Sequence, residues 1–184
     1  MRMLATALAA ALAFTPVAAI PALPPGARAP DFTTTGALAG RPFRLHLAEQ
    51  LRHGPVVLYF YPRAFTQGCT LEARAFSQAA AQFRRAGARV IGMSADDYDT
   101  LRRFSVEACR NAFPVATASA ETSRAYDVLL REGANTTNRT SYVIAPDGRI
   151  LYAHSEMDWR NHVANTLAAV RQWHAEQQQQ RRRR

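Results

Sequence analysis

The 184-residue sequence contains no lysine, only two cysteines, and no apolar run of the roughly 20 residues that a membrane-spanning helix needs. All 23 basic residues are arginines. Of the formal charge of +9, Arg181 to Arg184 supply +4 and Arg2 supplies +1, which leaves +4 for the rest of the chain. A charge this small argues against a protein that binds nucleic acid.

The N-terminal residues are typical of an export signal. Arg2 precedes an apolar run from Met3 to about Phe14, and Pro16 and the small residue Ala19 follow. We therefore predict a signal peptide at 1–19, cleaved after Ala19, and a periplasmic or secreted protein without stable membrane insertion.

The length and the apolar content of 48% suit one globular domain, which we place at 27–175. The tail EQQQQRRRR, residues 176–184, is of low complexity and offers nothing to bury. We expect this tail to be disordered.

Predicted strands and helices alternate along the domain. Strand patterns lie at 27–47 (a hairpin around two glycines), 55–62, 88–95, 113–118 and 140–155 (a hairpin with Pro-Asp-Gly at its turn), and helix patterns at 47–54, 69–87, 99–112, 122–128 and 159–177. Alternation favours parallel crossovers, and the last hairpin adds antiparallel strands. We predict an α/β protein of thioredoxin-like type, with a mixed central β-sheet flanked by helices.

Cys69 stands where the helix after a Thr-Gln-Gly turn begins, so free backbone N–H groups and the helix dipole favour an anion there. A thiolate is such an anion. Lowering a thiol pKa from about 8.5 to about 6 takes roughly 3.4 kcal/mol, whereas a helix end contributes at best about 2 kcal/mol. An arginine could supply the remainder, but nothing clearly aims Arg63 or Arg74 at the site.

These residues carry a resemblance. Pro62, Thr66 and Cys69 match the Pro-x-x-x-Thr-x-x-Cys signature of peroxiredoxins (the AhpC/TSA superfamily), and the surrounding sequence resembles the bacterioferritin-comigratory, or Q-type, branch. The stretches that extend the resemblance from Ala29 to the last helix are APDF, VVLYFYP, CTLE, VIGMSADD, FPV and NRTSYVIAPDGRI.

The resemblance implies a role for each matching residue. Cys69 would be the peroxidatic nucleophile, Thr66 and the nearby backbone N–H groups would hold the peroxide oxygens, and Pro62 would shield the pocket. Arg139 would be the missing cation, and Glu72 would orient it. Each residue also has a structural alternative: a helix cap for Thr66, a strand terminator for Pro62, a dipole partner for Glu72 and a solvated arginine for Arg139.

The implied activity is that of a thiol-dependent peroxidase, which reduces hydrogen peroxide or small organic hydroperoxides through a sulfenic acid on Cys69. Such an enzyme needs no cofactor or metal. It needs an external thiol reductant, either a thioredoxin-like protein or a small thiol. We expect a monomer or a homodimer.

The second cysteine, Cys109, does not match the resolving positions of the Q-type branch, which here hold Arg74 and, in the following helix, Ser105. Cys109 lies about 15 Å along that predicted helix, and a disulfide needs Cα atoms within about 7 Å. Three interpretations stay open: a resolving thiol that is reached after unfolding, a small buried apolar residue, or an intermolecular partner.

Two other functions of the same fold fit the sequence less well. A dithiol oxidoreductase needs Cys-x-x-Cys, but the second position is Glu72. A metal-binding module needs Cys-x-x-x-Cys, but that position is Ala73, and the five histidines form no short-spaced set with the cysteines. A secreted redox or metal-binding module of the thioredoxin fold, without peroxidase activity, is the alternative hypothesis. A catalytically silent binding module, which mutation of Cys69 would leave intact, is a third one.

Overall fold

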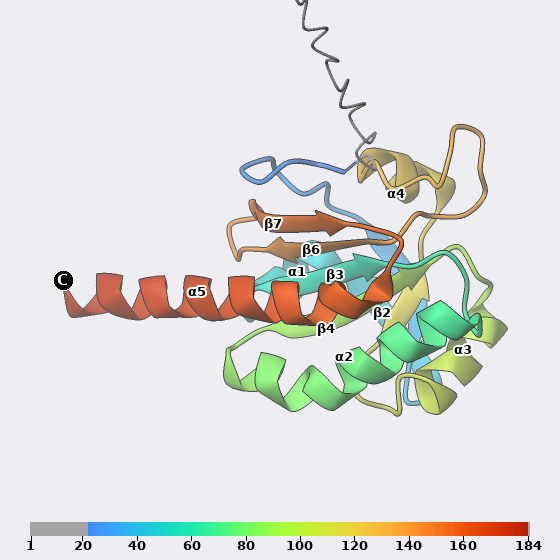
Figure 1. The fold of residues 1–184 in the computed structure, drawn as a ribbon, viewed down its shortest axis with the longest axis horizontal. Helices are drawn as coiled ribbons and strands as arrows, with labels where there is room; N and C mark the ends of the chain where they lie inside the picture. Colours follow the sequence, from blue (N-terminus) through green and yellow to red (C-terminus); the bar gives the residue numbers. More distant parts are fainter. Residues whose placement is uncertain (1–21, 184) are drawn as a thin grey trace, which may run out of the picture.

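The computed structural model describes residues 22–183, and its elements follow the predicted alternation (Figure 1). The predicted signal peptide, 1–19, lies outside the described residues. The strands are β1 (Thr33–Leu38), β2 (Arg41–His46), β3 (Val56–Phe60), β4 (Arg89–Ser94), β5 (Val115–Thr117), β6 (Thr140–Ile144) and β7 (Ile150–Ser155). The helices are α1 (Leu47–Leu51), α2 (Gln67–Arg85), α3 (Tyr98–Glu107), α4 (Ala120–Ala125), the 3-10 helix η1 (Trp159–Asn161) and α5 (His162–Arg182).

The seven strands form one sheet in the order β2-β1-β5-β4-β3-β6-β7. β4 pairs in parallel with both β3 and β5, and the remaining pairs are antiparallel. The predicted mixed sheet of thioredoxin-like type, with an N-terminal hairpin in β1 and β2, is confirmed.

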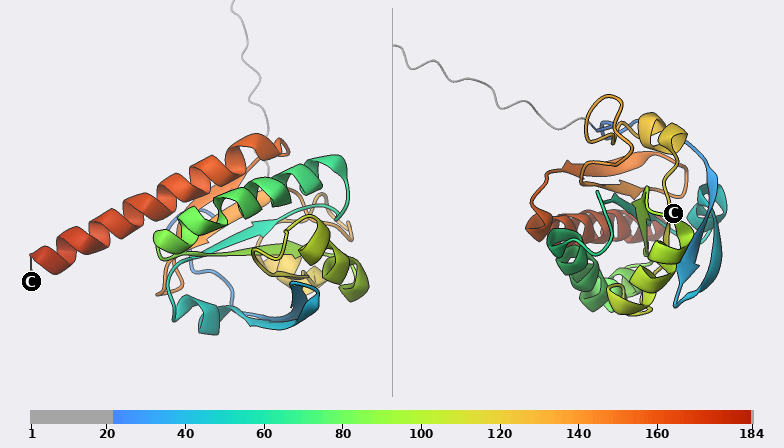
Figure 2. Two further views of the ribbon diagram at one scale, coloured as in Figure 1. Left: turned by 90° about the horizontal axis from the view of Figure 1, so that it is seen from below. Right: turned by 90° about the vertical axis from the view of Figure 1, so that its right-hand side faces the viewer.

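Helices cover both faces of the sheet, and α2 and α5 lie side by side on one of them (Figure 2). β3 is buried along its whole length, and its residues alternate between two apolar clusters. Val57 and Tyr59 join the cluster that contains residues of α2, α3 and α5, whereas Leu58 and Phe60 join the one that contains residues of α1. This layering explains the continuous apolar run in the sequence.

Glycine is required at position 36, where β1 pairs with β5. A β-carbon at Gly36 would lie 2.1 Å from the carbonyl oxygen of Val115. No other residue type permits this pairing without displacing a strand.

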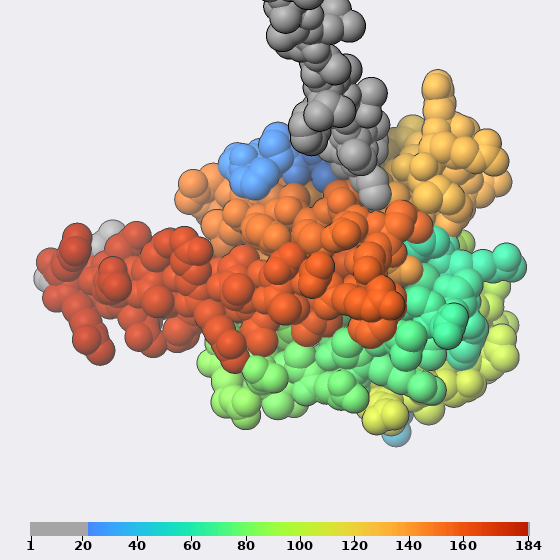
Figure 3. All heavy atoms as spheres, viewed as in Figure 1, coloured from blue at the N-terminus to red at the C-terminus, as the bar shows by residue number. Residues whose placement is uncertain are grey.

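The prediction that 176–184 is disordered differs from the structure, in which α5 continues to Arg182 and its end stands clear of the body (Figures 1 and 3). Glutamine, glutamate and arginine are good helix formers, and a helix that is already anchored by Leu167 and Val170 extends at little cost. Within residues 22–183, no helix combines the length and apolar character needed to cross a membrane.

Candidate active site

Cys69 is the third residue of α2, and the loop 61–66 connects this helix to the end of β3. The helix begins after Thr66, whose side chain makes no capping hydrogen bond, so the first-turn N–H groups keep their capacity to bind an anion. The Cys69 side chain is almost enclosed, at 2% exposure. The thiol therefore lies at the positive end of a helix and away from bulk water.

Arg139 reaches this thiol from the opposite part of the chain. It directly precedes β6, and the antiparallel pairing of Thr140 with Phe60 brings it to the end of β3. Its Nη2 donates to Cys69 Sγ at 3.4 Å, its Nη1 donates to Glu72 Oε2, and its Nε donates to the carbonyl oxygen of Met157 at 3.0 Å. The guanidinium is thus held in three directions.

The two local arginines of the sequence do not take this place, because Arg63 and Arg74 are exposed. Burial opposes the charge of Arg139, but Glu72 and Cys69 outweigh burial and raise the pKa of Arg139. The site therefore contains a permanent cation.

Glu72 is fully buried. Burial raises the pKa of Glu72 to about 8, although the charge and the hydrogen bond of Arg139 act in the opposite direction. Its contact with Arg139 is the one that the predicted orienting role requires.

His162, the first residue of α5, lies behind Glu72 with its Nδ1 3.7 Å from Glu72 Oε1. Nε2 donates to the carbonyl oxygen of Glu156 at 2.9 Å, and Nδ1 then accepts from the Ser141 hydroxyl at 2.8 Å. Burial lowers the pKa of His162 to about 4. The sequence analysis missed this residue, since no local motif distinguishes it from the other histidines.

Thr66 and Pro62 lie at the entrance to α2. The exposed Thr66 hydroxyl donates to the carbonyl oxygen of Arg63 at 3.0 Å, which leaves its lone pairs available as acceptors. Pro62 is half-buried, and its carbonyl oxygen accepts from the Thr136 hydroxyl. The structure brings Cys69, Glu72 and Arg139 into contact, with Thr66 one turn away.

Cys109 does not lie in the helix as predicted, because α3 ends at Glu107 and the chain turns. Its thiol is unpaired and fully buried, and burial raises its pKa, so the thiol is neutral. The next two residues, Arg110 and Asn111, have left-handed backbone angles (φ 50° and 61°). The turn that contains Cys109 is therefore strained.

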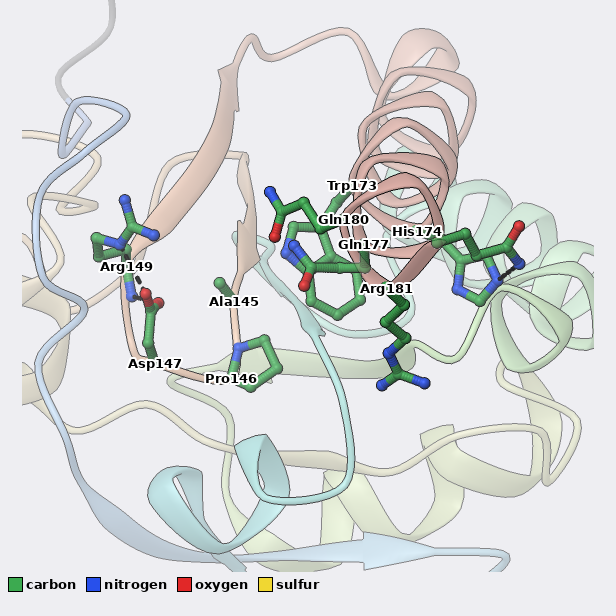
Figure 4. Close-up of a pocket in the computed structure, with 10 residues that line it drawn as sticks. Ala145, Pro146, Asp147, Arg149, Trp173, His174, Gln177, Gln180 and Arg181 are labelled. Carbon is green, nitrogen blue, oxygen red and sulfur yellow. Dashed lines mark hydrogen bonds and ion pairs between the residues drawn. The ribbon is translucent and has the colours of Figure 1, made fainter. Parts of the chain in front are cut away.

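Neither the hollow near the end of α5 nor any group of metal ligands among the described residues indicates a second functional centre. A hollow of about 580 Å³ lies between the β6–β7 turn and the end of α5, with Asp147, Arg149, Trp173 and Arg181 in its lining (Figure 4). None of the site residues above lines it. In the part of the chain that the structure describes, no three His, Cys, Asp or Glu side chains are grouped to hold a metal ion.

Comparison with known proteins shows which family the chain is similar to. The model of the AhpC/TSA family matches residues 25–153. Peroxiredoxin Bcp of Xanthomonas campestris is 30% identical over 128 residues, which cover 66% of this chain and 79% of that protein. Chloroplastic peroxiredoxin Q of Oryza sativa subsp. japonica is 30% identical over 146 residues, 77% of this chain but only 64% of the relative's length.

A solved structure also matches. The crystal structure of peroxidoxin BcpB from Mycobacterium tuberculosis has a TM-score of 0.71 at 32% identity, and the match covers 80% of this chain and 96% of that one.

Proposed function

The chain belongs to the AhpC/TSA family and is a thiol-dependent peroxidase, and we propose that Cys69 is its peroxidatic residue. The observation that carries this assignment is the contact of Arg139 Nη2 with Cys69 Sγ at the beginning of a helix. Among residues 22–183, no comparable polar group contacts Cys109, and its buried thiol is neutral.

In the proposed reaction, the Cys69 thiolate attacks one peroxide oxygen. A sulfur–oxygen bond forms, the oxygen–oxygen bond breaks, and the leaving oxygen takes a proton to become water or an alcohol. Arg139 and the first-turn N–H groups stabilise the negative charge that develops on the leaving oxygen. Thr66 accepts a hydrogen bond from the peroxide, Glu72 orients Arg139, and Pro62 restricts access of water.

The substrate is a peroxide and the reductant is a thiol. We propose hydrogen peroxide or small organic hydroperoxides, because a thiol with 2% exposure favours a small substrate. An external thiol, from a thioredoxin-like protein or a small molecule, finally supplies the electrons that return oxidised Cys69 to its reduced form.

Cys109 is the proposed resolving thiol, reached when its turn unfolds. Two features support this role: it is the only other cysteine of the chain, and the strain at Arg110 and Asn111 lowers the cost of opening the turn. In its buried, neutral state it cannot attack the sulfenic acid.

We also propose that the protein is exported and works as a monomer or a homodimer. The charged and apolar pattern of residues 1–19 supports export. A fusion of these residues to a reporter that is active only outside the cytoplasm tests this proposal, with Arg2→Glu as the matched variant.

The test of the site is intact mass after stoichiometric hydrogen peroxide, with a sulfenic-acid trap, in wild type, Cys69→Ser and Cys109→Ser. We expect a two-hydrogen loss in wild type and trapped adduct in Cys109→Ser. Oxidation that does not depend on Cys69 would overturn the assignment of Cys69. Adduct in wild type without the mass loss would overturn only the role of Cys109.

A further inference from the structure

The buried site has one permanent cation for two groups that become anions. Arg139 contacts both Cys69 and Glu72, which are 2% and 0% exposed. A thiolate and a carboxylate together would leave one buried negative charge without a counterion, which is strongly unfavourable. The site therefore needs one more positive charge or one more proton.

The structure has a place for that proton. Glu72 Oε2 receives Arg139, but Oε1 is buried without a hydrogen-bond partner. Oε1 lies 3.7 Å from His162 Nδ1, which has no hydrogen because Nε2 carries it, and whose lone pair already accepts from the Ser141 hydroxyl. The neutral ring therefore offers Oε1 no N–H donor, and a proton on Oε1 removes the uncompensated charge of the buried carboxylate.

We propose that Glu72 holds one proton while Cys69 is a thiolate, and releases it when Cys69 becomes a sulfenic acid. This inference rests on the proposed role of Cys69 as the peroxidatic residue. The proton lies on Glu72 Oε1, and His162 is a positioning residue whose neutral ring, held by Ser141 and the carbonyl oxygen of Glu156, presents no N–H to Oε1.

The surroundings favour the carboxyl as the proton carrier. Burial raises the pKa of Glu72 to about 8 and lowers that of His162 to about 4. The charged and polar groups around the pair come from β3 and the residue after it, α2, β6 and the residue before it, β7, the segment before η1, and α5: Tyr59, Tyr61, Cys69, Arg139, Ser141, His154, Glu156, Asp158 and Asn165. The ring of His154 lies 4.5 Å from that of His162, and both it and Arg139 oppose a charge on His162.

The charges balance through the reaction. Before it, the thiolate neutralises Arg139, and Glu72 is an uncharged acid. The thiolate supplies the electron pair of the new sulfur–oxygen bond, the oxygen–oxygen bond breaks, and the leaving alkoxide or hydroxide gains one proton. Glu72 loses one proton and replaces the thiolate as the counterion of Arg139, so the site remains neutral.

Infrared difference spectroscopy of the reduced full chain at neutral pH tests the proposal. We expect the carbonyl band of a protonated carboxyl, absent in Glu72→Gln and retained in Glu156→Gln. We expect the band to be lost in Cys69→Ser, which has no thiolate. In Cys109→Ser, which stops at the sulfenic acid, one equivalent of peroxide should abolish it.

The His162→Gln variant tests how His162 affects the proton on Glu72 while it keeps a polar side chain at this position. Its amide can donate to Oε1 and so stabilise the carboxylate, and we expect the band to titrate away at least one pH unit lower than in wild type. An unchanged midpoint would overturn the role of His162. A reduced wild type whose spectrum equals that of Glu72→Gln, or a band that survives oxidation, would overturn the proton exchange. Peroxide consumption that depends on Cys69, measured on the same preparation, shows whether the proposed function stands independently.

Discussion

Replacement of Arg139 by lysine tests whether the shape of the guanidinium, in addition to its charge, drives peroxide reduction. The guanidinium uses separate nitrogens for Cys69, Glu72 and Met157, and a single ammonium group cannot serve all three positions. Loss of one preorganised donor to a developing oxyanion typically costs about 100- to 1,000-fold in rate, or about 3 to 4 kcal/mol. We therefore expect the second-order rate constant for hydrogen peroxide to fall on the order of 100-fold in Arg139→Lys and toward 1,000-fold in Arg139→Gln.

The assay is a single turnover of the reduced protein, followed by stopped flow and by intact mass. Circular dichroism and urea unfolding confirm that each variant is folded. Arg149→Lys is the matched control, because Arg149 is exposed at the β6–β7 turn, pairs with Asp147 and lies outside the proposed site. An Arg139→Lys rate within about threefold of wild type would refute the argument from shape, and the same result for Arg139→Gln would remove Arg139 from the site.

Three further predictions concern stability. From pH 6.5 to 8 the difference in unfolding free energy between wild type and Glu72→Gln should fall by about 2 kcal/mol, because folded Glu72 (pKa about 8) keeps a proton that the unfolded carboxyl (ordinary pKa about 4.5) has lost. Two other groups have the opposite slope: His162, whose pKa is lowered to about 4, and Cys69, which is a thiol when unfolded and a thiolate in the proposed folded site. Both groups are present in the two proteins, so urea unfolding of both at pH 6.5 and at pH 8 isolates the contribution of Glu72. Gly36→Ala should cost about 3 kcal/mol or prevent folding, since its β-carbon meets the Val115 backbone, and thermal melts measure this loss. Gly133→Ala is the comparison, because its β-carbon meets nothing within 4 Å and only its left-handed φ of 71° costs stability, about 1 kcal/mol. Deletion of 176–184 should change the unfolding free energy by less than about 0.5 kcal/mol, and a larger loss would show that the end of α5 packs on the body.

The order of elements could be predicted because each has a local cause. The apolar run of β3 reflects burial on both faces, and Asp97 caps α3 by accepting from the Thr100 N–H at 2.8 Å. The first and last residues of the helices and strands were less predictable. The pattern extended the third helix to 112, whereas the backbone turns after Glu107. Leu71 follows the apolar pattern of α2 but is exposed, because only the tertiary arrangement decides which side of a helix is covered.

The residues of the candidate site are far apart in the sequence. Arg139 and Cys69 are 70 positions apart, and only the pairing of β6 with β3 brings them together. No spacing rule connects such residues, so the resemblance to a family was needed to select Arg139 among many arginines. His162 had no such guide, because its position depends on how the beginning of α5 meets the beginning of α2.

The two cysteines show why residue type alone does not assign chemistry. Both are buried and unpaired, and both belong to the same apolar cluster. Cys69 lies at a helix N-terminus against Arg139, so an anion is stabilised there, whereas burial keeps the Cys109 thiol neutral. In the folded chain the two thiols therefore cannot exchange roles. If Cys109 takes part in the cycle, it acts only after its turn leaves the core, and the rate of that opening, rather than thiol reactivity, then limits how fast the sulfenic acid is resolved.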